Sequence, residues 1–394
     1  MTVRCVINVR FKIMKRLYII PLLCLLALSG CSWINKSKAK ELPPIQVAPQ
    51  IQVQPLWSKT VGDGTNKQYL LLTPSQSGQH LFVDDAKGHI IALDANTGHI
   101  LWKTKLKHPL TTGPRAAANK IFVGTGDANV VALDDATGKV LWQTRVPNQV
   151  LARPGYAAGR LFVKTIDGQI LALDADTGKE IWAYGESLPT LILRGGSSPV
   201  GAGSKVVVGF ANGKLTVLNL NDGLQLWERS IARPEGLSAI QQMIDIDADP
   251  IVLDGIIYVA TYQGNLQALR LDTGDLVWEH KMSTYGAMAH NDKNLFVTDS
   301  SGHLWAFDLH SGLVLWRQNR LADRQITGPA LVGNELVVGD DKGNLYWVSQ
   351  SDGRLMAKQV AQNKIPFYSQ PVGLGKEVVA INSKGKVFAY AVPA

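Results

Sequence analysis

The residues that could carry out chemistry are few and scattered along the chain. None of the eight His residues stands in a His-Glu-x-x-His pattern or beside acidic residues at the spacing of metal ligands. Residues 245–249 begin like a calcium-binding loop, but Pro250 stands where such a loop requires Gly and Ile256 where it requires Glu. Ser197 and Ser198 lie in no Gly-x-Ser-x-Gly turn. We therefore predict no catalytic centre, no metal site and no cofactor.

A repeated segment dominates the sequence instead. Its clearest copy runs from Gly168 through an alternating apolar stretch and a Thr-Gly turn to Trp182, which is the pattern of a β-hairpin. Seven copies lie between residues 88 and 357, and they end at Trp102, Trp142, Trp182, Trp227, Trp278, Trp316 and, in place of the seventh Trp, Ala357. The intervals of 40, 40, 45, 51, 38 and 41 residues are typical of four-stranded propeller blades.

Each repeat contains enough apolar runs for four strands, and its Trp is expected to pack between neighbouring blades. A further copy of the pattern Leu-Trp-x-x-Thr, centred on Trp57, stands near the N-terminus, whereas the last repeat lacks its outer strand. We therefore predict an all-β, eight-bladed β-propeller over residues 51–394, closed by the N-terminal strand. Closure removes the open sheet edges that favour aggregation.

The N-terminal region has the pattern of an export signal. Met14-Lys-Arg16 precedes an apolar run over residues 17–28, and Leu-Ser-Gly-Cys31 fits a bacterial lipoprotein signal, in which small residues precede an acceptor Cys. A plain signal peptide would not need this Cys, and a retained membrane anchor would require a longer run. Ser32, where Asp commonly marks retention at the inner membrane, favours transport to the outer membrane.

Three regions are therefore expected. Residues 1–30 form a signal peptide whose true start is Met14, residues 31–50 form a flexible tether lipidated at Cys31, and residues 51–394 form the propeller. Loss of residues 1–30 removes five basic residues and no acid, so the net charge falls from +8 to +3. No basic stripe remains to favour a nucleic-acid partner, and no Cys remains for a disulfide.

The repeat resembles the tryptophan-docking motif of quinoprotein dehydrogenases, which are also eight-bladed propellers. This chain lacks the vicinal Cys pair that those enzymes hold over their quinone cofactor, together with the inserted segments that build the site. The resemblance therefore predicts the fold, and quinone binding is retained only as a minor alternative.

The whole chain resembles the BamB family, the propeller lipoproteins of the outer-membrane β-barrel assembly machine. Two segments that interrupt the repeat carry the specific likeness: residues 187–199, with the pattern Leu-x-Leu-Arg, and residues 233–250, with the pattern Asp-x-Asp. In that family the matching segments contact a periplasmic domain of BamA, the barrel subunit. The resemblance thus implies a BamA-binding surface made by Leu191, Leu193, Arg194, Asp245 and Asp247.

Other interpretations of these residues stay open. Leu191 and Leu193 alternate, as on one face of a strand; Asp245 and Asp247 could belong to a solvated turn. Arg194 could pair with either Asp inside the chain. The expected function is a non-enzymatic scaffold, monomeric within a larger complex, which binds BamA and supports insertion of barrel proteins into the outer membrane. Direct capture of unfolded barrel precursors by strand addition at a blade edge is the alternative.

Overall fold

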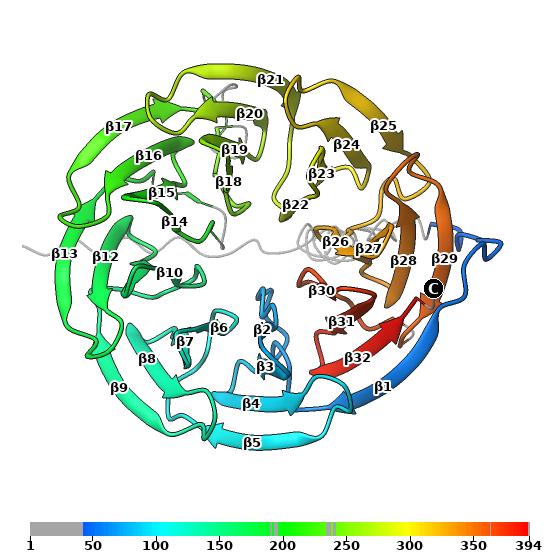
Figure 1. Cartoon of the computed structure of the whole chain (residues 1–394), viewed down its shortest axis with the longest axis horizontal. Coiled ribbons are helices and arrows are strands. Elements are labelled where there is room, and N and C mark those ends of the chain that lie inside the picture. Colours follow the sequence, from blue (N-terminus) through cyan, green and yellow to red (C-terminus); the bar gives the residue numbers. More distant parts are fainter. Residues whose placement is uncertain are drawn as a thin grey trace, which may run out of the picture. The chain divides into compact units, whose positions relative to one another are not determined.

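The computed structural model describes residues 42–189, 191–192, 196–233, 238, 242–362 and 364–392. Across these ranges the regular structure is entirely β, and no helix is long and apolar enough to cross a membrane. The propeller belongs to one compact unit, Ile45–Ala394, which begins six residues before the expected boundary at residue 51. The expected all-β, eight-bladed propeller is confirmed, because the strands form eight sheets of four strands each (Figure 1).

Seven blades are built from consecutive strands, which run from the central axis to the rim. They are β2 (Ser75–Ser77), β3 (His80–Asp84), β4 (His89–Asp94) and β5 (Ile100–Lys105); β6 (Arg115–Ala117), β7 (Lys120–Gly124), β8 (Asn129–Asp134) and β9 (Val140–Arg145); β10 (Gly155–Ala157), β11 (Arg160–Lys164), β12 (Gln169–Asp174) and β13 (Glu180–Gly185); β14 (Val200–Ala202), β15 (Lys205–Gly209), β16 (Lys214–Asn219) and β17 (Gln225–Ser230); β18 (Ile251–Leu253), β19 (Ile256–Ala260), β20 (Gly264–Arg270) and β21 (Leu276–Met282); β22 (Met288–His290), β23 (Asn294–Thr298), β24 (Leu304–Asp308) and β25 (Val314–Gln318); β26 (Ala330–Val332), β27 (Glu335–Gly339), β28 (Asn344–Ser349) and β29 (Leu355–Val360).

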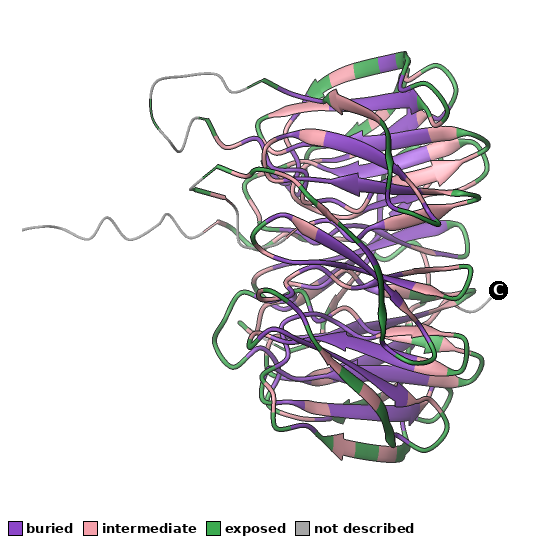
Figure 2. Ribbon diagram, turned by 90° about the vertical axis from the view of Figure 1, so that its left-hand side faces the viewer, coloured by how far each residue is buried: buried purple, intermediate pink, exposed green. Residues whose placement is uncertain are grey.

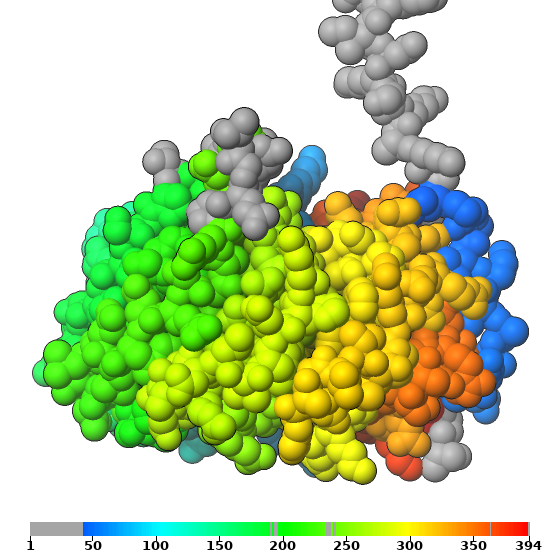
Figure 3. Space-filling model, turned by 90° about the horizontal axis from the view of Figure 1, so that it is seen from above, coloured from blue at the N-terminus to red at the C-terminus, as the bar shows by residue number. Residues whose placement is uncertain are grey.

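The eighth blade joins the two ends of the propeller. Its order is β30 (Val372–Leu374), β31 (Glu377–Ile381), β32 (Lys386–Ala391) and, outermost, β1 (Gln54–Thr60), which pairs antiparallel with β32. In Figure 3 the blue N-terminal segment lies beside the orange and red C-terminal part of the ring. The ring is therefore closed by strand pairing between the two ends of the propeller.

Burial follows the position of a strand within its blade. The second and third strands, such as β11 and β12, are buried on both faces because they lie between two neighbouring blades (Figure 2). The rim strands alternate, and β5 has the pattern exposed, exposed, intermediate, exposed, intermediate, exposed. The intermediate third residue of β5 is Trp102, which reaches into the space between two blades. The Trp spacing in the sequence thus marks the blade junctions.

Each Trp at a rim strand is docked on the next blade by the same two contacts. Its indole N–H donates to a carbonyl of the hairpin turn that ends in Gly, at 2.9 Å from Trp102 to Asp135 and at 3.1 Å from Trp142 to Ala175. The indole also covers the turn Gly: at Gly178, a Cβ would come within 2.6 Å of the Trp142 ring. The same hydrogen bond is made by Trp57, Trp182, Trp227, Trp278 and Trp316.

The junction without a rim Trp has a structural explanation. Ala357 faces the last blade, whose third and fourth strands, β32 and β1, come from opposite ends of the propeller. No Thr-Gly turn joins those strands, so an indole at position 357 would have no turn to dock on. Trp347, paired with Ala357 in the register of β28 and β29, fills the space instead and packs edge-on against Tyr390 at 5.6 Å. Its buried N–H has no hydrogen-bond partner within the described residues.

Residues 45–53, which include the end of the expected tether, lie against the ring. Ile45 and Val47 pack on one core cluster, and Ile51 and Val53 pack on the next. The amide of Gln50 also donates to the carbonyl of Met356 at 2.7 Å. Apolar residues at alternating positions in this segment give it a face to bury, which explains why the compact unit extends past the predicted boundary.

The closing strand gives a direct test of the fold. We expect Trp57→Ala to destabilise the protein by about 3 kcal/mol, because it removes an indole packed between the first and last blades together with its hydrogen bond to Ala95. Leu56→Ala on the same strand should change stability by less than about 1 kcal/mol, because Leu56 is exposed. Thermal unfolding of both variants measures the difference, and equal melting temperatures would contradict closure through Trp57.

Candidate functional site

Two consecutive links between blades are longer than the nine-residue links that precede them; the link 61–74, which follows β1, also has fourteen residues. Residues 186–199 connect β13 to β14, and residues 231–250 connect β17 to β18, whereas the links 106–114 and 146–154 have only nine residues. Each long link runs from the rim of one blade to the axis of the next, and the blades concerned are neighbours (Figure 1). Both therefore emerge at the same end of the ring, where loops on a rigid scaffold commonly carry recognition.

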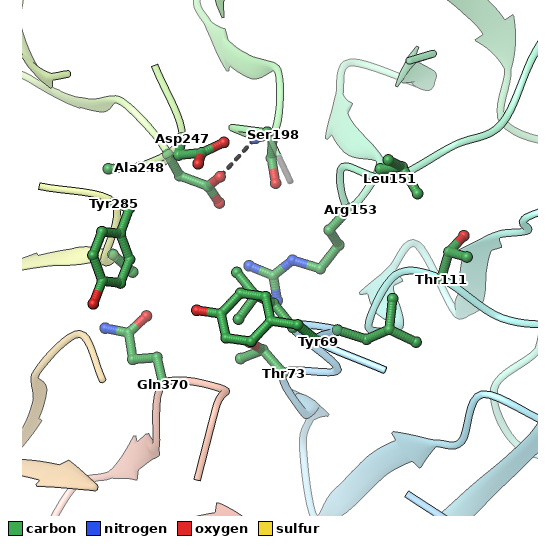
Figure 4. A pocket seen from close by; sticks show the side chains of 15 residues that line it. Tyr69, Thr73, Thr111, Leu151, Arg153, Ser198, Asp247, Ala248, Tyr285 and Gln370 are labelled. Atoms are coloured by element: carbon green, nitrogen blue, oxygen red, sulfur yellow. Dashed lines mark hydrogen bonds between the residues drawn. The ribbon is translucent and has the colours of Figure 1, made fainter. Parts of the chain in front are cut away.

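The two links are hydrogen-bonded to each other. The Ser198 amide donates to an Asp249 carboxylate oxygen at 2.6 Å, a contact marked by the dashed line in Figure 4, and the Ser197 amide donates to the Ile246 carbonyl at 3.4 Å. The Tyr262 amide also donates to the Asp245 carbonyl at 2.9 Å, which ties the second link to a turn of the following blade. The two segments thus form one joined surface.

The residues proposed for binding occupy different environments within this surface. The side chain of Leu191 is 45% exposed, whereas Asp245 is only 1% exposed. Asp247 is partly buried and lines a cavity at the axis of the ring. Leu193 and Arg194 lie outside the described residues, as does Cys31. The structure therefore brings the link with Asp245 and Asp247 against the link that carries Leu191. Of the two Asp residues, only Asp247 lines the cavity at the axis.

Lys164 is a charged residue of this region that the sequence analysis missed. It lies at the end of β11, buried, and its ammonium donates to the Gly209 carbonyl at 2.9 Å and to the Ser197 hydroxyl at 3.3 Å. Burial lowers the pKa of Lys164 from 10.5 to about 8, although the carboxylates of Asp247, Asp249 and Asp245 act in the opposite direction. Lys164 thus ties β11 to the next blade and to the first of the two links.

Alignment of the repeats could have identified Lys164. Three of the seven equivalent strands end in Gly, and the others end in Asp84, Ala260, Thr298 and Ile381. Lys164 is thus the one basic residue at this position in the eight described blades, and a buried amine needs polar partners.

The carboxyl group of Asp247 is electrostatically perturbed. Burial raises its pKa to about 6, the nearby Lys164 ammonium lowers it, and the Asp249 carboxylate raises it. At neutral pH Asp247 is therefore mostly charged although it is poorly solvated. A carboxylate of this kind favours a cationic partner, because the partner replaces the solvation that burial removes.

Asp63, Asp85 and His89 also come together in the described part of the chain, with ligand atoms within 4.8 Å of one another. Asp85 accepts hydrogen bonds from the amides of Asp63, Lys87 and His89, and its carboxylate contacts the His89 ring at 2.7 Å. These bonds hold the turn between β3 and β4, so the cluster has a structural explanation without an ion.

Comparison with known proteins identifies the family. Residues 86–318, which are 233 of the 394 residues, match the family described as outer membrane protein assembly factor BamB. The outer membrane protein assembly factor BamB of Alkalilimnicola ehrlichii is 44% identical over 95% of this chain and 97% of its own length. The chain belongs to the BamB family. The resemblance stated from the sequence is confirmed, and the family name associates its members with assembly of outer membrane proteins.

Solved structures agree with the BamB assignment at the level of the fold. The BamB structure from Moraxella catarrhalis aligns with a TM-score of 0.78 at 22% identity, over 86% of this chain and 100% of that one. The quinohemoprotein alcohol dehydrogenase of Comamonas testosteroni aligns with a TM-score of 0.69 at 13% identity, over 86% of this chain and 76% of that one. The dehydrogenase thus shares the fold alone, whereas full-length BamB relatives are named as assembly factors, which implies a non-enzymatic role.

The coupling between Lys164 and Asp247 gives a second prediction. Lys164→Met removes the positive charge that lowers the Asp247 pKa, so we expect Asp247 to titrate above its value of about 6. The carboxyl carbon signal of Asp247, followed by NMR between pH 4 and pH 9, measures this shift. Lys120→Met provides the control, because Lys120 pairs with the exposed Asp176 and does not contribute to the Asp247 pKa. An unchanged Asp247 titration in Lys164→Met would contradict the coupling.

Proposed function

We propose that this chain is a lipid-anchored, non-enzymatic scaffold that binds a periplasmic domain of BamA and so supports insertion of β-barrel proteins into the outer membrane. Membership of the BamB family supports the assembly role. One structural observation carries the proposed interface: the segments 187–199 and 233–250 come from consecutive blades and are hydrogen-bonded to each other at one end of the ring. A rigid ring then presents both segments to one partner.

The chemistry of this surface suits a protein partner. Leu191 offers an exposed apolar side chain, and Arg194 and Asp247 supply opposite charges within the same two links. Apolar and Arg anchors surrounded by polar groups are typical of the residues that dominate binding energy at interfaces. In this proposal Leu191, Leu193, Arg194 and Asp247 contact BamA, while Asp245, which is only 1% exposed, supports the second link from inside the protein.

Arg194→Glu tests the interface. We expect the affinity for the soluble periplasmic domain of BamA to fall at least tenfold, or about 1.4 kcal/mol, because a contacting charge has been reversed. The melting temperature should stay within about 1–2 °C of the wild type if Arg194 contacts only the partner. Calorimetric titration with the BamA domain measures the first effect, and thermal unfolding measures the second.

Arg145→Glu is the matched control, because it makes the same charge change at an exposed position of the rim strand β9. Leu191→Ser should also weaken binding while the fold is retained, since Leu191 is exposed. Asp245→Lys is unsuitable, because burying an extra amine at a residue only 1% exposed would destabilise the fold itself. Retained affinity in both Arg194→Glu and Leu191→Ser would exclude this surface.

The anchor is proposed separately. Signal peptide residues 1–30 would be removed, with Met14 as the true start, and the acceptor Cys31 would carry the lipid that holds the propeller at the outer membrane, facing the periplasm. We expect the intact mass of the protein purified from membranes to correspond to a tri-acylated chain beginning at Cys31. Cys31→Ala should leave the protein unprocessed or soluble in the periplasm. A native protein cleaved at another residue and free of lipid would contradict this anchor.

Strand addition is the alternative mechanism, and the rim of the ring favours it. Rim strands such as β5, β9 and β21 each have a strand on one side only, and each carries two exposed aliphatic residues before its Trp. An extended precursor segment could pair with such an edge through its backbone. Binding of this kind would tolerate Arg194→Glu and Leu191→Ser, so the same titrations with a barrel-precursor peptide separate the two mechanisms.

A further inference from the structure

A cavity of about 410 Å³ opens at the axis of the ring, within the size range of small-ligand sites. Its wall includes four Tyr side chains and two carboxylates that come from links and turns of separate blades: Tyr69, Tyr262, Tyr285, Tyr368, Asp247 and Asp341. We call this space the axial cavity. Its residues are distant in the sequence and meet only because the propeller is closed.

Aromatic faces form much of the axial cavity. The rings of Tyr69 and Tyr368 lie 5.0 Å apart between centroids at an angle of 55°, and Tyr69 is 49% exposed. Tyr69 and Tyr285 line both this cavity and the smaller one beside it, which Figure 4 shows with the two side chains on separate segments. Burial, aided by Tyr285, Asp247 and Tyr368, raises the pKa of Tyr69 to about 12, so its phenol stays neutral at physiological pH. Neutral Tyr rings present electron-rich faces that attract cations.

The charge of the axial cavity is negative. Among the described residues that line it, Asp247 and Asp341 are the charged ones, and no Lys or Arg is present. Asp341 also pairs with the exposed Lys342 at 3.0 Å, but a surface pair of this kind contributes little free energy. Arg153 belongs to a smaller adjoining cavity of about 100 Å³, which also contains Asp249, and in Figure 4 it reaches in from the side opposite Tyr285.

We propose that the axial cavity binds an organic cation, such as the Lys or Arg side chain of a polypeptide or a quaternary ammonium group. The Tyr rings contact the apolar body and the positive charge, and the two carboxylates face the charge from different blades. This combination is the usual recognition chemistry for ammonium and guanidinium groups. The Lys164 ammonium already lowers the pKa of Asp247, yet burial keeps that pKa raised to about 6, so a bound cation would stabilise the carboxylate further.

This inference goes beyond the proposed BamA interface. Asp247 belongs to both sites, whereas Tyr285 and Asp341 line the axial cavity and are not part of the proposed interface. Variants of Tyr285 and Asp341 therefore test the cavity without changing the proposed interface. Conversely, Arg194→Glu tests the interface, so failure of one proposal leaves the other standing.

The wild-type protein gives the first test. Nα-acetyl-lysine amide, Nα-acetyl-arginine amide and tetramethylammonium are titrated separately against the mature protein while the ring signals of Tyr69 and Tyr285 are followed by NMR. We expect a Kd on the order of 1 mM for at least one of these cations. Nα-acetyl-norleucine amide, which matches the lysine probe without its charge, should bind at least tenfold more weakly.

Matched variants then locate the cation. Asp341→Asn should weaken binding about fivefold or more, because one of two attracting charges is lost. Tyr285→Phe should keep the affinity within about twofold, since the aromatic face remains, whereas Tyr285→Leu should lose most of it. Asp176→Asn on the rim is the charge control and should change nothing. The melting temperatures of all variants are measured as well, to show which variants remain folded. If a variant fails to fold, the wild-type comparison of charged and neutral probes still tests whether the cavity binds a cation.

The probes also distinguish the source of the cation. Tighter binding of the lysine or arginine probe indicates a polypeptide side chain, and tighter binding of tetramethylammonium indicates a small quaternary ammonium compound or headgroup. Equal affinity for the lysine probe and its norleucine analogue would overturn the proposal, because the cavity would then recognise only apolar volume. So would unchanged Tyr69 and Tyr285 signals with every cation at about 10 mM, ten times the expected Kd.

Discussion

The contact between a rim Trp and the Gly-containing turn of the next blade is the interaction on which the rest of the structure depends. One indole fills the space between two sheets, covers the turn Gly and donates a hydrogen bond to a turn carbonyl. Each such hydrogen bond contributes only about 1 kcal/mol, but the buried indole adds several times more. Because seven junctions repeat this contact, the angle between blades is set locally, and the ring closes after eight blades.

This repetition also determines where the sequence is free to vary. The hairpins that carry the Trp and the turn must keep their register, whereas the links from rim to axis need only reach the next blade. The longest link, residues 231–250, and the link 186–199 therefore insert residues without disturbing the docking. Their hydrogen bonds to each other hold them on the scaffold. Residues of these links and turns form both the candidate partner surface and the axial cavity. The Trp contacts hold the framework beneath them rigid.

Much of the fold could be predicted from the sequence because its determinants are local. The Trp interval gave the blades, and the pattern around Trp57 gave the closure. The role of Trp347 could not be foreseen, because it depends on the absence of a turn between β32 and β1. Burial of Asp245 could not be predicted either. An irregular link has no regular alternation of apolar and polar residues from which buried and exposed positions could be distinguished. The convergence of Tyr69 and Tyr285 required the closed ring, because 216 residues separate them along the chain.

The closing strand imposes an order of events on folding. β1 is the first strand of the chain and β32 the last, yet Thr60 and Lys386 are partners in the finished sheet. Seven blades can form from strands adjacent in sequence, whereas the eighth requires the two ends of the propeller to meet. Completion of the ring is then a single late step, and before it the unpaired edge of β32 is available to chaperones and to aggregation alike.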